Sequence, residues 1–178
     1  MKNVIRCATG RSVLGPFVVA LSERGLALVE FGTLTASDLA VRLPEVEAIE
    51  ETADLQATVA VIGARIEDPW ASCDLALDLQ GSAFELAVWQ ALRDIPTGTM
   101  TTYGELASHL GMPRAAREVG EACAANRLAV IVPCHRVVKK DGSISGYRWG
   151  VQRKRALLER EGIAGLLHRP AAVAHGAT

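Results

Sequence analysis

One short segment of the chain places a thiol, an imidazole and a guanidinium side by side. Cys134, His135 and Arg136 follow Pro133 at the end of a continuous apolar run. A free cysteine has a pKa of about 8.5, so it needs a base or a cation nearby to be nucleophilic at neutral pH. His135 can supply either, but neighbours on a regular strand face opposite ways, so contact requires a backbone bend after Pro133 or a bridging water. The segment predicts a nucleophile at Cys134.

A carboxylate that could orient this imidazole stands at the end of a predicted helix over 151–161. Val151, Leu157 and Leu158 give that helix an apolar face, and Glu161 shares the face at a spacing of four and three residues from the leucines. A carboxylate at a helix C-terminus is disfavoured by the helix dipole and needs a positive or hydrogen-bonding partner. A solvated last turn is the alternative, and the pattern alone leaves both interpretations open.

The other three cysteines lack such neighbours. Cys7, Cys73 and Cys123 are far apart and form no CxxC pair, so the sequence indicates neither a disulfide framework nor a cysteine-rich zinc site. We interpret them as reduced, structural thiols. No metal and no cofactor are expected.

The elements before residue 80 predict an α/β module. The runs 17–21 and 26–31 are apolar and rich in β-branched residues, and they flank a turn-like Ser-Glu-Arg-Gly, which predicts a hairpin. Residues 37–43 and 54–66 have helical spacing, and 74–79 alternate like a strand. We find no chemical constellation in this half.

Capped helices dominate after residue 81. Capping-box patterns at Ser82 and Thr102 predict two helix starts, and Pro113 at a first helical position predicts a third helix running through Ala124. Helix, Gly-containing turn, helix is the helix-turn-helix outline. From 114 to 124 the third helix combines arginines with small residues, which favours DNA contact over close helix packing, the alternative. The apolar run 128–132 predicts a buried strand, and 140–143 a tight turn.

Charge divides along the chain in the same way. Residues 1–80 carry a net charge of −6 and residues 81–161 a net charge of +4, so the second half is the candidate to meet a polyanion, although an ordinary solvated surface is the alternative. No apolar run approaches the length of a membrane helix, and the N-terminus lacks a secretory signal pattern. We expect a cytoplasmic protein.

With IVPCHRVV in view, the chain resembles the O6-alkylguanine-DNA alkyltransferase family, most of all the C-terminal half of bacterial Ada proteins. The segments FELAVWQALRDIP, TTYGELASHLG, EACAANRLAVIVPCHRVV, DGSISGYRWG and RKRALLEREG follow in the family's order. The resemblance is strong over about residues 79–162 and looser before them.

The resemblance implies a fold, an activity and a set of site residues. It implies a ribonuclease H-like α/β module over 1–80, a mainly α domain with a helix-turn-helix of winged-helix type over 81–165, and a tail over 166–178. It implies irreversible, single-turnover transfer of a small alkyl group from O6-alkylguanine, and from O4-alkylthymine, to Cys134. The implied partner is double-stranded DNA, bound by a monomer through the minor groove without sequence preference, with the damaged base rotated out.

Roles carry over residue by residue. Cys134 matches the alkyl acceptor, His135 the water-linked base, Glu161 its orienting carboxylate and Asn126 the amide that ties the active-site strand to the helix-turn-helix. Residues that match DNA contacts are Tyr103, Arg114, Ala116, Arg117 and Gly120, with Arg117 entering the base stack. Residues that match the guanine pocket are Val137, Ser145, Tyr147 and Arg148.

Three other functions remain open from the residues. Cys134, His135 and Glu161 also fit a cysteine hydrolase, since such triads recur on unrelated folds. The chain also fits a damage-binding protein without chemistry, which the presence of Cys134 disfavours, and a helix-turn-helix regulator with an incidental thiol. One alkyl group gained per protein on Cys134 would exclude the hydrolase, and a preference for one operator sequence over random DNA would identify the regulator.

Overall fold

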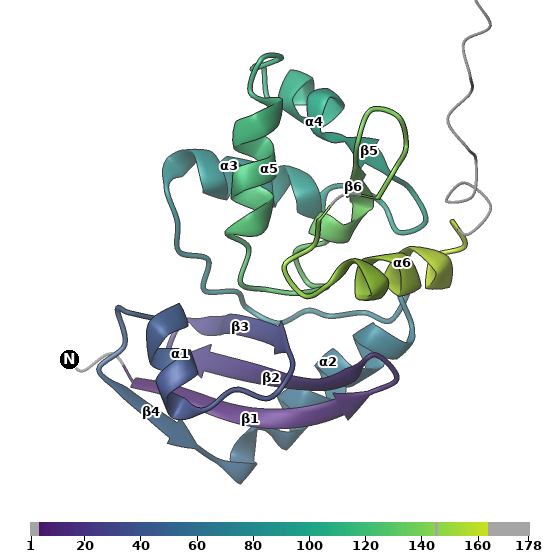
Figure 1. Ribbon diagram of the computed structural model, residues 1–178. Helices are drawn as coiled ribbons and strands as arrows, with labels where there is room; N and C mark the ends of the chain where they lie inside the picture. The colour runs from purple at the N-terminus through teal and green to yellow at the C-terminus, as the bar shows by residue number, and fades with distance from the viewer. Residues whose placement is uncertain (1–3, 145, 164–178) are drawn as a thin grey trace, which may run out of the picture.

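The computed structural model describes residues 4–144 and 146–163, without the side chains of residues 48, 50 and 51. Ser145 and the predicted tail 166–178 lie outside the described residues. A four-stranded sheet occupies one half of the molecule and a group of helices the other (Figure 1). The strands are β1 Val4–Ser12, β2 Gly15–Ser22, β3 Gly25–Phe31 and β4 Ala48–Glu51.

The sheet has the order β3-β2-β1-β4, with β4 parallel to β1 and the other pairs antiparallel. The predicted hairpin is confirmed as β2 and β3, joined at Ser22 and Gly25. Its side chains alternate between faces: Phe17 and Val19 pack in one apolar cluster, Val18 and Ala20 in another. Both faces are therefore buried, as the continuous apolar runs require.

A helix covers each face of the sheet. Helix α1 (Ala36–Arg42) places Leu39 in the cluster on one face, and α2 (Gln56–Glu67), preceded by the short 3₁₀ turn η1 (Ala53–Leu55), places Ile62 and Ile66 in the cluster on the other (Figure 1). These helices confirm the two predicted from spacing.

Within the described part of the second half, residues 81–144 and 146–163, lie four helices, one 3₁₀ turn and a pair of very short strands. They are α3 Ala83–Arg93, β5 Thr101–Thr102, α4 Tyr103–His109, α5 Ala116–Ala124, the 3₁₀ turn η2 Cys134–Arg136, β6 Val137–Val138 and α6 Val151–Arg160. Strands β5 and β6 pair in parallel. Both predicted capping boxes are formed, at Ser82 and Thr102. The Trp89 indole donates to the Ala122 carbonyl at 2.8 Å and so ties α3 to α5.

Two predicted strands are wrong, and both segments lie along the free edge of β3. Residues 74–79 form a single bridge, Leu77 to Leu26, and residues 128–132 form a single bridge, Leu128 to Val29. The first segment is extended but pairs only at Leu26. The second segment coils after Leu128, and Val130 has a φ of 68°, a left-handed conformation that a β-branched residue rarely adopts.

The coil at 128–132 has a local cause in Asn126. Its side-chain oxygen accepts from the Leu128 amide at 2.8 Å, and its Nδ2 donates to the Leu128 carbonyl at 3.4 Å and the Val132 carbonyl at 2.9 Å. These bonds satisfy buried backbone groups that a neighbouring strand would otherwise satisfy. The amide therefore takes the place of a strand partner.

Two helix predictions need correction. Helix α5 begins at Ala116, after a turn in which Ala115 donates to Met112, so Arg114 lies before the helix. Ala115 has no side chain that could cap the helix, and the pattern at Pro113 gave its start too early. On α6, Val151 is 41% exposed at the first position of the helix, so it does not contribute to the buried apolar face as predicted.

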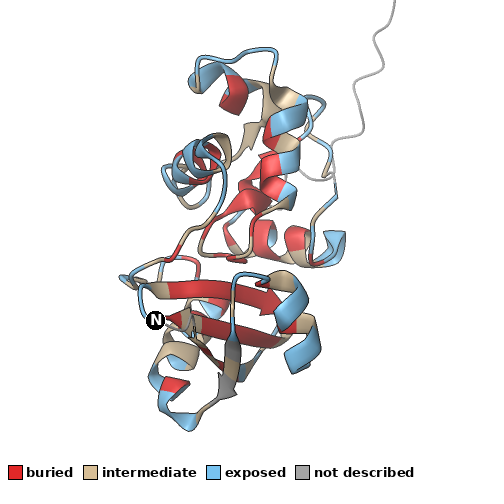
Figure 2. Cartoon of the chain, turned by 90° about the vertical axis from the view of Figure 1, so that its left-hand side faces the viewer, coloured by how far each residue is buried: buried red, intermediate tan, exposed pale blue. Residues whose placement is uncertain are grey.

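Buried residues continue from the sheet into the helices of the second half (Figure 2). Backbone bonds from Val29 to Arg127 and from Ala129 to Val29, both 2.9 Å, fasten the segment before Cys134 to the sheet. The sheet is thus the support for the segment that carries the thiol. Among the described residues, none of the helices has the length and apolar character needed to cross a bilayer.

The capping box of α3 gives a stability prediction. Ser82→Ala removes the side chain that accepts from the Glu85 amide at 3.2 Å, and we expect it to lower the free energy of unfolding by about 1 kcal/mol in urea titrations. Ser108→Ala is the matched control, because Ser108 bonds within a helix, to the Gly104 carbonyl, and should change stability by less than about 0.5 kcal/mol. Equal effects of the two substitutions would contradict the capping assignment.

Candidate active site and nucleic-acid interface

The three adjacent residues of the sequence motif lie on a turn. Cys134, His135 and Arg136 form the 3₁₀ turn η2, and these residues are 5%, 1% and 3% exposed. A turn of this kind points successive side chains about 120° apart. The three side chains therefore lie against different parts of the protein. The backbone bend expected after Pro133 is present.

His135 and Glu161 are in direct contact. The imidazole Nε2 lies 2.8 Å from Glu161 Oε1, and Glu161 is 5% exposed at the C-cap of α6. The Gly98 amide donates to Oε2 at 3.0 Å, and Arg136 donates to both oxygens. The alternative of a solvated last turn is therefore wrong: the carboxylate is buried and fully engaged.

These contacts fix the charge state of the pair. Burial alone would raise the pKa of Glu161, but hydrogen bonds from His135 and Arg136 outweigh it and bring the pKa to about 2. Burial lowers the pKa of His135 despite the neighbouring carboxylate. The resting pair is thus a carboxylate and a neutral imidazole, and Nε2 must carry the proton that faces Oε1. Among the described residues Nδ1 has no hydrogen-bond partner, so its lone pair is available.

The thiol of Cys134 lies against Asn126. The Asn126 Nδ2 is 3.3 Å from Sγ, in addition to its bonds to the backbone of 128–132. Burial raises the pKa of Cys134, while the bond from Asn126 and the positive charge of Lys154 lower it. In the resting protein the sulfur is a thiol surrounded by groups that favour its anion.

Lys154 is a site residue that the sequence reading missed. It is 1% exposed, donates to the Val137 carbonyl at 2.6 Å and lies 6.0 Å from the centre of the Tyr103 ring. Burial lowers the pKa of Lys154, and its charge acts on Cys134. The helical spacing in the sequence could have identified it. Lys154 precedes Leu157, Leu158 and Glu161 by three, four and seven residues and so lies on their face of the helix.

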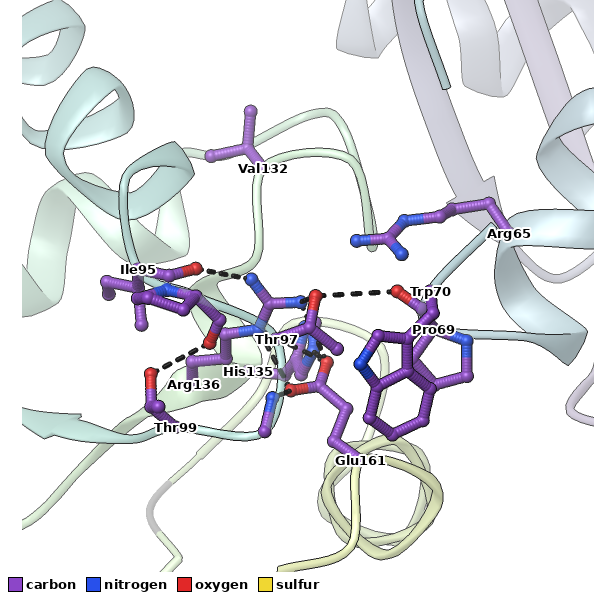
Figure 3. Close-up of polar contacts among 12 residues, drawn as sticks. Arg65, Pro69, Trp70, Ile95, Thr97, Thr99, Val132, His135, Arg136 and Glu161 are labelled. Carbon is purple, nitrogen blue, oxygen red and sulfur yellow. Dashed lines mark hydrogen bonds and ion pairs between the residues drawn. The ribbon is translucent and has the colours of Figure 1, made fainter. Parts of the chain in front are cut away.

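Arg136 holds the carboxylate to a distant part of the chain. Its Nη1 donates to the Ile95 carbonyl at 2.6 Å and its Nη2 to the Thr97 hydroxyl at 3.0 Å, both in the connection from α3 to β5. Figure 3 shows the guanidinium between these acceptors and Glu161. The sequence placed Arg136 beside the thiol and the imidazole but predicted no role for its guanidinium.

Four of the five predicted DNA contacts line one groove. Tyr103, Ala116, Arg117 and Gly120 share it with Lys139 and Lys140 of the loop that follows β6. The Arg117 side chain is 88% exposed and pairs with Glu121 at 3.2 Å. A Cβ on Gly120 would come no closer than 3.8 Å to the Tyr103 ring, so the fold itself does not require glycine there. Arg114 lies outside this groove, beside Met112 and Glu118.

The residues predicted for a guanine pocket are only partly assembled. The Tyr147 hydroxyl is buried without a hydrogen-bond partner among the described residues, and the ring packs edge-on against Trp149 at 5.1 Å. Burial and the charge of a Cys134 thiolate both raise the pKa of Tyr147. The Tyr147 hydroxyl therefore stays protonated at neutral pH. Arg148 reaches Glu30 of the sheet at 3.4 Å, and Val137 is fully buried in β6. Ser145 lies outside the described residues.

Comparison with known proteins gives this geometry a family. The family described as "6-O-methylguanine DNA methyltransferase, DNA binding domain" matches residues 83–163. The "Bifunctional transcriptional activator/DNA repair enzyme Ada" of Escherichia coli is 44% identical over 88% of this chain and 45% of its own length. The "Methylated-DNA--protein-cysteine methyltransferase" of Mycobacterium bovis is 52% identical over 49% of this chain and 53% of its own length. The chain thus spans about half the length of these curated relatives.

A solved structure covers nearly the whole chain. It is the Mycobacterium tuberculosis OGT in complex with DNA, with a TM-score of 0.75 and 34% sequence identity, over 92% of this chain and 94% of that one. A second structure, of the Mycobacterium tuberculosis O6-methylguanine methyltransferase, has the same TM-score and identity over 94% and 96% of the two chains. The likeness therefore includes the sheet as well as the helices. By sequence and by structure the chain belongs to the O6-methylguanine-DNA methyltransferase family.

Proposed function

We propose that this protein repairs alkylated DNA by moving a methyl or small alkyl group from O6 of guanine, and from O4 of thymine, onto Cys134. The observation that carries the proposal is the buried contact of His135 with Glu161, at the residue that follows a thiol bonded to Asn126, in a domain whose surface groove presents Arg117. The names of the relatives, which describe methyl transfer from DNA to a protein cysteine, support the same reaction.

The proposed reaction begins with the thiol proton. His135 Nδ1 accepts it through a water molecule, and Glu161 stabilises the imidazolium that forms. Asn126 and Lys154 stabilise the thiolate, through a hydrogen bond and a positive charge respectively. The sulfur then attacks the alkyl carbon, the carbon–O6 bond breaks, and its electron pair leaves with the guanine.

The leaving guanine takes up a proton, and Tyr147 is the proposed donor near its ring. The Tyr147 hydroxyl is buried and unpartnered among the described residues, so a base entering beside it would supply the missing acceptor. The product is a thioether, which has no low-barrier route back to a thiol. Each molecule of protein therefore acts once.

The proposed DNA surface is the groove along α5. A buried thiol cannot reach O6 in a stacked duplex, so the base must rotate out, at a cost of a few kcal/mol. Arg117 is the proposed filler of the stack, Tyr103 presses on the backbone, and Ala116 and Gly120 let the helix approach the minor groove closely. Arg114, before the helix, is proposed as a phosphate contact. With few long side chains to read bases, binding without sequence preference follows, and we propose that a monomer binds.

We further propose that the α/β module is ribonuclease H-like over 1–80, that the helix-turn-helix of 81–165 is of winged-helix type, and that 166–178 form a tail. Val137, Ser145 and Arg148 join Tyr147 in the proposed guanine pocket. A cytoplasmic location is proposed because an acceptor thiol must stay reduced.

Transfer to the thiol is tested by weighing the protein. After incubation with duplex DNA containing O6-methylguanine, we expect intact-mass spectrometry to show one added methyl group, and peptide mapping to place it on Cys134. Cys134→Ser should gain none, while Cys123→Ser, which changes a neighbouring buried thiol, should gain one as the wild type does. Methyl on another residue, or product exceeding one equivalent, would refute the mechanism.

The role of the groove is tested at Arg117. Arg117→Ala should slow methyl transfer from duplex DNA at least tenfold while leaving the reaction of Cys134 with iodoacetamide unchanged, because only base rotation needs this side chain. Arg11→Ala, at an exposed arginine of β1, is the control and should match the wild type in both assays. Equal slowing by both substitutions would mean that charge alone accounts for the effect.

The charge of Glu161 gives a pH prediction. Its pKa is about 2 in the folded protein against about 4.3 in an unfolded chain, so its contribution to stability is present above pH 4.3 and is lost as the pH falls toward 2. Glu161→Gln should therefore lower the free energy of unfolding at pH 7, measured by urea titration. The difference in this free energy between the variant and the wild type should shrink as the pH falls through this window. A gap that stays constant from pH 6 to pH 3 would contradict the assignment.

A further inference from the structure

Arg136 donates hydrogen bonds both to the Glu161 carboxylate and to the segment that connects α3 to β5. It donates three times to Glu161, from Nε at 3.1 and 3.0 Å and from Nη2 at 3.0 Å. Its remaining bonds go to the Ile95 carbonyl and the Thr97 hydroxyl, which itself donates to the Pro69 carbonyl at 3.4 Å. The guanidinium therefore joins the carboxylate to the connection between α3 and β5.

Arg136 provides three of the hydrogen bonds that hold the Glu161 carboxylate in place. Glu161 stands at the C-cap of α6, where the helix no longer fixes its direction, and three rotatable bonds separate its carboxylate from the backbone. Apart from Arg136, its hydrogen-bond partners among the described residues are the Gly98 amide and His135. Without the guanidinium the carboxylate can turn away from Nε2, and the imidazole then loses the acceptor that selects its protonated nitrogen.

The surrounding charges make this orientation matter. The charged groups that act on the pair are Arg136, Arg65 from α2 and Lys154 from α6. All three are cations, so among the described residues the imidazolium that forms on proton transfer depends on the carboxylate of Glu161. A small displacement of that carboxylate leaves the imidazolium among like charges.

We infer that Arg136 is a positioning residue for the thiol: it fixes Glu161 against Nε2 of His135, and thereby keeps Nδ1 as the atom that receives the proton of Cys134. The inference builds on the proposed function, because it assigns a residue to the same proton relay. Arg136 acts through Glu161 and does not itself touch the alkyl group.

Arg136→Lys is the decisive substitution because it keeps the charge. An ammonium group is a compact donor and cannot bind both carboxylate oxygens of Glu161 together with the Ile95 carbonyl and the Thr97 hydroxyl. We expect the pH at which Cys134 becomes half-reactive toward iodoacetamide, followed by peptide mapping at this cysteine, to rise by about one unit, equivalent to about tenfold less thiolate below the midpoint. Methyl transfer from duplex DNA should slow by a similar factor, with DNA affinity unchanged.

Arg42→Lys is the matched control. Arg42, whose side chain is 29% exposed, pairs with the buried Glu30 at 2.6 Å, so its substitution perturbs another arginine–glutamate pair, in the sheet half. It should lower stability in urea without moving the iodoacetamide midpoint. If Arg136→Lys also leaves the midpoint at the wild-type pH, the inference is overturned.

A second variant keeps the test open if Arg136→Lys does not fold. Thr97→Val removes one acceptor of the guanidinium and changes no charge, so a smaller shift in the same direction supports the inference and an unshifted midpoint overturns it. The iodoacetamide reaction uses no DNA. Its outcome is therefore separate from that of the proposed function, which is tested by the methyl group that the wild type gains from O6-methylguanine.

Discussion

A single buried carboxylate, Glu161, sets the arrangement of the site. It is reached by the imidazole of η2, the guanidinium of the next residue and the backbone of Gly98. A carboxylate without such partners would be too costly to bury, so each donor must be in place when the protein folds. This requirement fixes the end of α6 against both the connection after α3 and the turn that carries Cys134. The three segments are far apart in the sequence, and Glu161 is the point where they meet.

The sheet supports this arrangement from the other side. The free edge of β3 takes up both the segment before α3 and the segment before Cys134, which also leaves less of that edge exposed. Arg153 of α6 donates to the Leu14 carbonyl at 2.9 Å, and Arg148 reaches Glu30. Contacts from the sheet therefore reach the thiol segment, α6 and the loop of Tyr147. The first half of the chain contains no chemistry of its own that we identified, and its role is to hold these parts in register.

Local signals in the sequence predicted local structure well. The capping boxes at Ser82 and Thr102, the hairpin of β2 and β3 and the turn at 140–143 depend on neighbouring residues, and all are formed. The apolar spacing on α6 also placed Glu161 on a buried face. The pairing of Glu161 with His135 then needed one further step, that a buried carboxylate requires a donor.

The predictions from sequence were wrong or incomplete where tertiary contacts determine the local structure. The apolar run 128–132 has the composition of a strand, but Asn126 satisfies its backbone and lets it coil. Helix α5 starts later than Pro113 suggested because the chain first makes a turn in which the Ala115 amide donates to the Met112 carbonyl. Lys154 was missed because a lysine on a helix is ordinarily solvated, and only the packing of α6 shows it buried beside the thiol. Arg136 was seen, but its acceptors at Ile95 and Thr97 are about forty residues away, and no spacing rule joins them.

The central claim is that the resting imidazole is neutral, with its proton on Nε2 and its lone pair on Nδ1. Nitrogen-15 NMR of histidine-labelled protein measures this directly, with the His135 signals assigned from a His135→Gln variant. We predict a single neutral tautomer, protonated on Nε2, that persists to pH values below the ordinary histidine pKa of about 6.5. A proton found on Nδ1, or a titration at the ordinary pKa, would contradict the account.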